Sequence, residues 1–457
     1  MFKKYNTNSN NGKDLFEYYN EGKAFAEEGK YLEAIKSFDE VIKLDNEYVN
    51  AHFNRGNMLY YLDRFEEALN SFNEAINLNN TNFKFFNNRG IVLEKLGRYE
   101  EALESYEVAI KLKEVKEAAD DYYVNKGAVL EKLRRYEDAS NAYDKAIEIN
   151  GKNYDAYNAQ GVLLEKFGNY EQAVKMLETA IEIKPEDGKA YSNLGTILSE
   201  FGRYEDAIEC IDEAIKYNPY SDKALNNKGI IFIKLKKYEE AINAFDKSIE
   251  LNPRNEYTYN NKGIAAKKLG MYKEAIDNYD KAIKLNGHFE QAYINKGMVL
   301  EVLNQNDEAH ECYEKAILIN PNNPAGYKNK ADVLRKLGEV EESISNYDRT
   351  IEISPNFKGA NYNKAMALYE IRNFDVAINH IEEELKFVKD NADIYILKAA
   401  TLTQIEKYDE AIKVYDEILE MGYINASIYF DKAKVLEKMG LDEEAKENYM
   451  KAKELAE

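Results

Sequence analysis

Residues 222–255 read DKALNNKGIIFIKLKKYEEAINAFDKSIELNPRN. Apolar or small residues recur in this stretch at spacings of three and four, first around Gly229 and again from Tyr238 onward. Such spacing is typical of amphipathic helices. Lys236 separates the two helical patterns, and Pro253 stops the second one. The stretch therefore predicts two short antiparallel helices joined by a tight turn.

The same pattern recurs along most of the chain, and successive copies lie 34 residues apart, as Gly22 and Gly56 do. One step is longer, 37 residues between Gly90 and Gly127. We number the places of each repeat from 1 to 34, with Gly229 at place 8. Place 8 is then small in thirteen successive repeats: Gly22, Gly56, Gly90, Gly127, Gly161, Gly195, Gly229, Gly263, Gly297, Ala331, Ala365, Ala399 and Ala433. A fixed period of this length predicts a stacked array.

The repeats are expected to start near residues 15, 49, 83, 120, 154, 188, 222, 256, 290, 324, 358, 392 and 426. Residues 1–14 then form a polar N-terminal segment, and residues 15–457 a single array. Three extra residues near Lys113–Ala119 are expected to lengthen one surface turn. From Ala331 onward place 8 is alanine instead of glycine, and Glu384 occupies a place that is otherwise small or apolar, so the last four repeats are expected to be looser copies. The last predicted helix, rich in Glu and Lys, is expected either to act as a polar cap or, as an exposed end, to favour self-association.

Other places repeat as well. Place 20 is alanine in all repeats except the tenth, which has Ser343, and place 32 is proline in five. Place 17 is usually aromatic: Tyr31, Phe65, Tyr99, Tyr136, Tyr170, Tyr204, Tyr238, Tyr272, Phe374 and Tyr408. This pattern resembles the tetratricopeptide repeat (TPR) family over nearly the whole chain. The resemblance implies an all-α, right-handed α-solenoid of about thirteen helix-turn-helix units, wound as a superhelix with the first helix of each unit on the concave side.

Place 6 carries the most unusual pattern. It is asparagine in ten repeats: Asn20, Asn54, Asn88, Asn125, Asn193, Asn227, Asn261, Asn295, Asn329 and Asn363. Asparagine is a mediocre helix-interior residue, and its amide can both donate and accept hydrogen bonds to a peptide bond. The row resembles the asparagine ladder in the superhelical region of O-GlcNAc transferase, which implies peptide binding by these ten residues. The alternative is structural, with each amide bridging to the backbone of the neighbouring repeat and contacting no ligand.

Charged residues also repeat. Place 7 is lysine or arginine in ten repeats, and place 25 is acidic in most. These two sets predict a ladder of surface ion pairs, each contributing about 0–1 kcal/mol. A basic row that binds acidic ligands is the alternative, which the overall acidity disfavours. The carboxylate-clamp subtype of the family is not supported, because Lys328 at place 5 is followed by Asp332 where that subtype has asparagine.

The composition excludes several classes of function. Net charge is −21, which disfavours nucleic-acid binding and membrane-surface binding. The polar start, Met1 to Lys13, does not resemble a secretory signal. The two cysteines lie at equivalent places three repeats apart and are expected to stay unpaired. We therefore expect a cytoplasmic protein without membrane insertion.

No catalytic constellation, metal-binding spacing or cofactor motif is found, and the four histidines fall at unrelated places. The sequence thus predicts a non-enzymatic scaffold that binds an extended peptide or protein segment in the concave groove of the superhelix. The alternative is a self-associating structural or assembly protein that acts through the solenoid ends or the convex face. The expected state is a monomer, or weak self-association through exposed ends.

Overall fold

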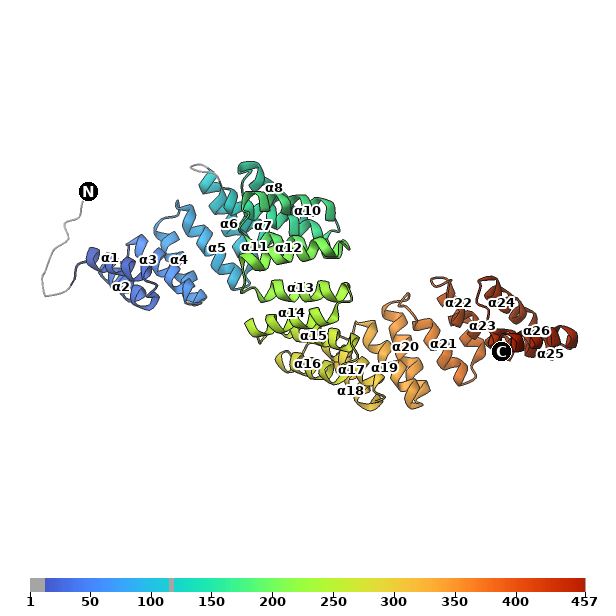
Figure 1. Cartoon of the computed structure of the whole chain (residues 1–457). Coiled ribbons are helices and arrows are strands. Elements are labelled where there is room, and N and C mark those ends of the chain that lie inside the picture. Colours follow the sequence, from blue (N-terminus) through green and yellow to red (C-terminus); the bar gives the residue numbers. More distant parts are fainter. Residues whose placement is uncertain (1–12, 115–118, 457) are drawn as a thin grey trace. The chain divides into compact units, whose positions relative to one another are not determined.

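The computed structural model describes residues 13–114 and 119–456, and it divides into two compact bodies, residues 1–227 and 228–457. Each body is described by itself, and the division falls within α13 (Asp222–Lys234). The described residues form 26 α-helices and no strand, arranged as consecutive pairs (Figure 1). The predicted all-α solenoid of thirteen helix pairs is confirmed; its right-handed sense stays a prediction.

The first helix of each pair spans 11 to 14 residues. These helices are α1 (Leu15–Glu27), α3 (Val49–Tyr61), α5 (Phe83–Lys95), α7 (Asp120–Lys132), α9 (Tyr154–Lys166), α11 (Gly188–Glu200), α13, α15 (Glu256–Lys268), α17 (Glu290–Val302), α19 (Pro324–Leu337), α21 (Ala360–Glu370), α23 (Ala392–Gln404) and α25 (Ala426–Lys438).

The second helix of each pair begins at place 17. These helices are α2 (Tyr31–Leu44), α4 (Phe65–Leu78), α6 (Tyr99–Glu114), α8 (Tyr136–Ile149), α10 (Tyr170–Ile183), α12 (Tyr204–Tyr217), α14 (Tyr238–Leu251), α16 (Tyr272–Leu285), α18 (Asn306–Ile319), α20 (Val340–Ile353), α22 (Phe374–Leu385), α24 (Tyr408–Glu420) and α26 (Asp442–Glu454). Helix α6 is the longest, at 16 residues. Residues 115–118 of the predicted insertion, and residues 1–12 of the predicted polar segment, lie outside the described residues.

The turn within each pair is set by place 15, which adopts φ between 56° and 88° in every repeat. This left-handed conformation reverses the chain after the first helix and favours glycine. Glycine supplies it in seven repeats, as at Gly29 and Gly97, whereas Asp63 and Arg134 adopt it at a modest conformational cost. The tight reversal brings the two helices of a pair together as antiparallel neighbours.

Close packing within each pair explains the small residue at place 8. A Cβ atom on Gly127 would lie 2.4 Å from the Tyr143 ring, and one on Gly22 would lie 2.7 Å from the Phe38 ring. The residue at place 24 of the second helix therefore packs directly on the backbone of the first helix. Small residues at place 20 complete the contact and are almost completely buried, Ala34 and Ala68 among them.

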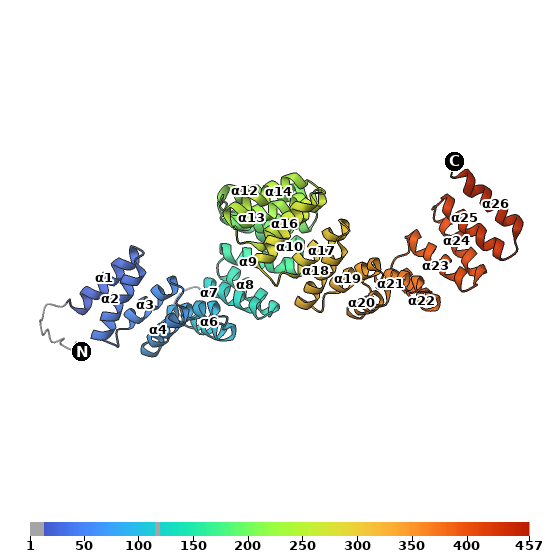
Figure 2. The same ribbon diagram turned by 90° about the horizontal axis from the view of Figure 1, so that it is seen from below.

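Successive pairs stack in two layers within each body. Each helix contacts the next helix along the chain, and in addition the first helices of neighbouring repeats contact each other, as α7 and α9 do in one body and α19 and α21 in the other (Figure 2). The layer of first helices is thus the more closely spaced of the two, which makes it the inner layer of each curved stack. No described helix is long and apolar enough to cross a lipid bilayer.

Helix α21 departs from the pattern because Glu384 replaces the usual small residue at place 27. Its carboxylate is 5% exposed and accepts hydrogen bonds from the backbone N–H groups of Gly359 (3.0 Å) and Tyr362 (3.4 Å). Gly359 has φ of 77°, and α21 begins only at Ala360. The carboxylate thus satisfies amides at the helix N-terminus, where negative charge is favourable.

Candidate functional site: the first-helix face

The asparagines at place 6 lie at the joints between neighbouring first helices. Seven of them donate an amide N–H to a side chain of the preceding repeat, at 2.8 to 3.1 Å. The pairs are Asn54 to Tyr19, Asn88 to Asn57, Asn125 to Asn87, Asn193 to Asn158, Asn227 to Thr196, Asn295 to Asn260 and Asn363 to Asp332. The row therefore bonds to neighbouring repeats, as the structural alternative proposed, although to side chains and not to the backbone.

The acceptor side chains occupy two fixed places of the repeat. Each lies at place 5 or place 9 of the preceding repeat, and one of these two places is polar wherever an asparagine donates. Where place 6 is Ala159, the preceding repeat offers only Val124 and Ala128. Asn261 also has an interaction partner.

Asn329 is the exception to this rule. The preceding repeat has Ile294 at place 5 and Met298 at place 9, so neither can accept a strong hydrogen bond. No partner for the Asn329 amide is found among the described residues, although this side chain is half-buried like most of the row. Asn20, in the first repeat, is exposed.

The asparagines of the row differ in how many hydrogen-bonding groups they leave for a ligand. Asn295 is only 6% exposed, so its amide serves the joint and offers little to solvent. The half-buried members, such as Asn54 and Asn193, use one N–H in the joint and keep a second N–H and a carbonyl oxygen. Binding of a peptide by the ten asparagines stays a prediction.

A small pocket opens on this face between α3 and α5. Its volume is about 220 Å³. The bonded amides of Asn57 and Asn88 form one side of the pocket. Its other walls are aromatic and aliphatic: Tyr60, Tyr61, Phe72, Ile91 and Val92. Apolar walls with a few convergent polar groups are the usual composition of a pocket that takes one side chain of a ligand.

The predicted ion-pair ladder is confirmed. Eight cations at place 7 pair with the acid at place 25 of the preceding repeat: Arg55–Asp39, Lys126–Glu107, Lys262–Asp246, Lys296–Asp280, Lys330–Glu314, Lys364–Asp348, Lys398–Glu382 and Lys432–Asp416. The cations are the more buried partners, since the Lys364 side chain is 9% exposed and that of Asp348 is 50% exposed.

The charges of the ladder stabilise each other. Burial lowers the pKa of Lys262, but hydrogen bonds to Asp246 and Glu274 outweigh it, so the pKa is raised overall. The hydrogen bond from Lys330 lowers the pKa of Glu314. Because these cations are already paired, the ladder is a structural feature and not a row of sites for acidic ligands.

A second set of polar contacts joins the two helices within a repeat. In five repeats the tyrosine hydroxyl at place 24 donates to an acid on the first helix: Tyr106 to Glu94, Tyr143 to Glu131, Tyr313 to Glu301, Tyr347 to Asp332 and Tyr449 to Glu437. Glu131 and Glu301 also pair with Lys166 and Lys336 of the following repeat. Sequence reasoning missed this network, although the coincidence of glutamate at place 12 with tyrosine at place 24 could have indicated it.

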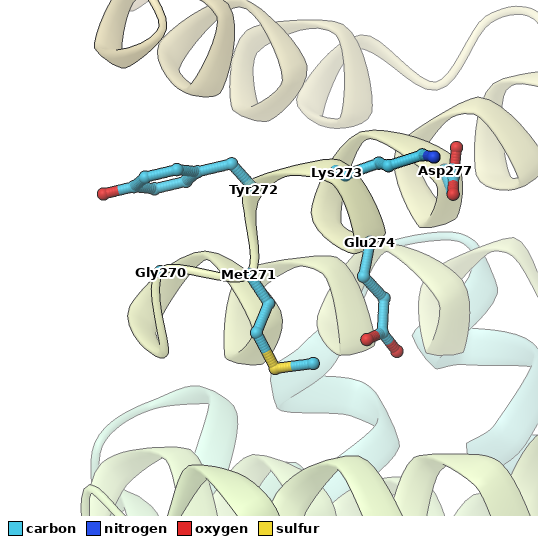
Figure 3. A pocket seen from close by; sticks show the side chains of 6 residues that line it. All are labelled: Gly270, Met271, Tyr272, Lys273, Glu274 and Asp277. Atoms are coloured by element: carbon cyan, nitrogen blue, oxygen red, sulfur yellow. The ribbon is translucent and has the colours of Figure 1, made fainter.

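Two further features are a shallow surface depression and two free cysteines. A shallow depression beside the first turn of α16 is lined by Gly270, Met271, Tyr272, Lys273, Glu274 and Asp277, and the side chains of Met271 and Tyr272 point in different directions (Figure 3). Among the described residues no group of histidine, cysteine and acidic side chains could hold a metal ion. Cys210 and Cys312 are both free, and burial raises the pKa of each to about 11, so neither is a reactive thiolate.

Comparison with protein-family models agrees with this architecture. Models described as tetratricopeptide repeat or TPR repeat match residues 22–63, 56–97, 83–114, 118–186, 164–226, 222–255, 256–289, 290–323, 312–345, 362–422 and 426–457. The chain belongs to the tetratricopeptide repeat family. Tandem TPR units support a role as a protein–protein interaction scaffold.

Two solved structures are similar to the chain. The structure of the APC/C hetero-tetramer Cut9–Hcn1 matches with a TM-score of 0.48 and 14% identity, over 93% of this chain and 96% of that one. Yeast Tom70 matches with a TM-score of 0.43 and 19% identity, over 96% and 95% of the two chains. No curated protein matches the sequence.

Proposed function

We propose that this TPR protein is a non-enzymatic, cytoplasmic scaffold that holds an extended polypeptide segment against its first helices. The observation that carries the proposal is the pocket between α3 and α5, where a bonded amide pair adjoins apolar walls on the inner layer. An extended peptide presents alternating side chains and a continuous row of backbone N–H and C=O groups. An apolar side chain fits the pocket, and the amides at its edge bond to the peptide backbone.

The joints between repeats favour this mode of binding. An amide that already donates one N–H to the preceding helix is held in one orientation, so less conformational entropy is lost when a peptide binds to its remaining groups. The half-buried asparagines are spaced by one repeat, which provides several such contacts along an extended chain. Weak individual contacts then add along the segment.

The outward faces of α1 and α26 favour the scaffold over self-assembly. At place 28, which is isoleucine or leucine in the first twelve repeats, α26 has Lys453. At place 3, which is apolar or small and buried in most repeats, α1 has the exposed Glu17. Stacking of one copy on another through these faces would oppose charged and polar side chains, which is unfavourable without partners.

The test is a selection of dodecapeptides from a random library on the immobilised chain, followed by site-specific photo-crosslinking. Benzoylphenylalanine is placed at Tyr61 in the pocket wall and, as a control of similar exposure, at Leu32 on the second helix α2; these side chains are 58% and 54% exposed. We expect the selected peptides to crosslink at position 61 and not at position 32. Anisotropy titrations should show weaker binding in Asn88→Ala than in Asn70→Ala, a matched change on α4.

Crosslinking at position 32 with none at position 61 would refute binding to the first helices. Light scattering across micromolar concentrations addresses the rival function. A mass that stays that of one chain supports the scaffold, and a mass that rises with concentration supports self-assembly through the ends or the convex face.

A further inference from the structure

The eighth repeat lacks an acid that its neighbours have. Tyr279 at place 24 is completely buried, like Tyr313 and Tyr347 in the next two repeats. Those two hydroxyls donate to Glu301 and Asp332, whereas the Tyr279 hydroxyl has no partner among the described residues. An unpartnered buried hydroxyl costs free energy, so this position is short of one acceptor.

The residue at place 12 of this repeat is a lysine instead of glutamate. Lys267 has no acidic partner among the described residues, and its amine donates to the Met298 sulfur, at 3.9 Å. Burial, and secondarily Lys268, lower the pKa of Lys267, as expected for a cation without a counter-charge. The tenth repeat has the only other cation at this place, Arg335, which pairs with Glu370 at place 13 of the following repeat, at 2.7 Å.

The residue that corresponds to Glu370 is Val302, which leaves Lys267 unpaired. Val302 is 54% exposed and Met298, one helical turn before it, is 40% exposed. Both lie on α17, which contacts α15 on one side and α19 on the other. The unpartnered amide of Asn329 lies on α19 at place 6. In the eleventh repeat the same place is Asn363, which donates to Asp332 at place 9 of the tenth repeat. Place 9 of the ninth repeat, where the acceptor for Asn329 would lie, is Met298.

We propose that these four residues, Lys267, Met298, Val302 and Asn329, form a subsite for a polypeptide segment in which a glutamate or aspartate side chain adjoins an apolar one. This subsite is called the Lys267 patch below. It rests on the proposed function and specifies the chemistry of the bound segment. The ligand carboxylate bonds to the Lys267 ammonium, as the Glu370 carboxylate bonds to Arg335 at the same place of the tenth repeat. The neighbouring apolar side chain covers Met298 and Val302, and Asn329 bonds to the backbone.

The local charges favour an acidic segment despite the net charge of −21. The acids at corresponding places of the flanking helices are already engaged, Glu301 by Lys336 and Asp332 by Lys328. Lys267 is therefore a local unneutralised cation, and a partly buried charge interacts strongly with a counter-charge because screening by water is reduced. A side-chain carboxylate is favoured over a chain terminus because the Glu370 side chain makes this contact with Arg335, the equivalent cation of the tenth repeat.

The test uses the full chain and a fluorescein-labelled peptide, acetylated and amidated, with the core Leu-Glu-Leu. A Leu-Gln-Leu peptide is the neutral control, and Leu-Gln-Leu with a free C-terminus tests a terminal carboxylate. We expect the Glu peptide to bind roughly tenfold more tightly than the Gln peptide, as for a hydrogen bond between charged groups. Lys267→Met should abolish this preference. Arg335→Met, which removes a paired cation at the same place of another repeat, should leave it unchanged.

Two further variants separate binding from folding. Val302→Glu copies the Arg335–Glu370 arrangement, so it should neutralise Lys267 internally and abolish binding without lowering the melting temperature. Lys267→Glu gives Tyr279 the acceptor that its neighbours have, and it should raise the melting temperature while abolishing binding.

The proposal is overturned if the Glu and Gln peptides bind equally, if the Glu peptide shows no saturable binding up to millimolar concentration, or if only the free C-terminus confers binding. Crosslinking of library-selected peptides at position 61 would still support the proposed function in each of these cases. The two failures are thus distinguishable.

Discussion

Replacing Gly127 by alanine tests the packing rule that defines each repeat. The new Cβ atom would lie 2.4 Å from Cε1, 2.7 Å from Cδ1 and 2.8 Å from Cζ of Tyr143. Carbon atoms pack best at about 3.5–4.0 Å, so the ring or the helix has to move by about 1 Å. Tyr143 is 1% exposed and its hydroxyl is bonded to Glu131, which leaves the ring little room.

Overpacking of this kind costs about 1–3 kcal/mol, and three short contacts place Gly127→Ala near the upper end. Alanine gains about 1 kcal/mol over glycine within a helix. We therefore expect a net loss of about 1–2 kcal/mol. Gly151→Ala is the control, because no atom lies within 4 Å of its new Cβ. Ala331, Ala399 and Ala433 stand opposite a tyrosine at place 24 in repeats that have evolved with alanine, whereas the helices around Gly127 are spaced for glycine. Ala365 stands opposite the smaller Ile381, so Tyr143→Ile should recover part of the loss.

The assay is native-state hydrogen exchange of α7 and α8, because stacked repeats do not unfold as one cooperative unit. Exchange should accelerate in these helices in Gly127→Ala and less so in the double variant. Unchanged or slower exchange in Gly127→Ala, with the fold intact by circular dichroism, would refute the claim that ring-on-backbone packing requires the small residue.

Three more results are expected. Glu384→Ala should destabilise the first turn of α21 by about 1–3 kcal/mol, measured by amide exchange, since two N–H groups lose their acceptor; an unchanged rate would contradict this capping role. Asp348→Asn should cost about 1–2 kcal/mol in chemical denaturation because it leaves the buried Lys364 unpaired, whereas Glu148→Gln, in an exposed pair, should stay within about 0.5 kcal/mol; equal costs would contradict the burial argument. Burial raises the pKa of Asp120, but hydrogen bonds from two asparagines outweigh it and hold the pKa below its usual value. The wild-type chain should therefore be more stable than Asp120→Asn above about pH 4, and this difference in unfolding free energy should shrink as the pH falls through the lowered pKa. A difference that grows in acid would contradict the assignment.

The sequence was sufficient to predict the helix pairs, because period and amphipathicity are local properties. It also predicted the ion-pair ladder, since the cations and acids repeat at constant places. The close packing of Gly127 on Tyr143 could be predicted in part, because the pattern places a small residue on the first helix opposite a large one on the second.

The partners of the asparagines were not predicted, because they depend on the offset between neighbouring first helices. The choice between place 5 and place 9 as acceptor becomes visible only when that offset is known. The N-terminal cap that Glu384 provides was missed for a different reason. In the sequence, Glu384 only breaks the pattern of small or apolar residues at place 27. Its role depends on the late start of α21, which the sequence does not show.

The alternation of acceptors between places 5 and 9 makes the repeats unequal as building blocks. Removing a single 34-residue block would keep the helical phase but change which side chains meet across the new junction. Joining the ninth repeat directly to the eleventh, for example, would set Asn363 against Met298 in place of Asp332. Recombination within such a gene, or a laboratory attempt to shorten the protein, therefore has to keep each asparagine next to a repeat with a matching acceptor. The order of the repeats is constrained as well as their number.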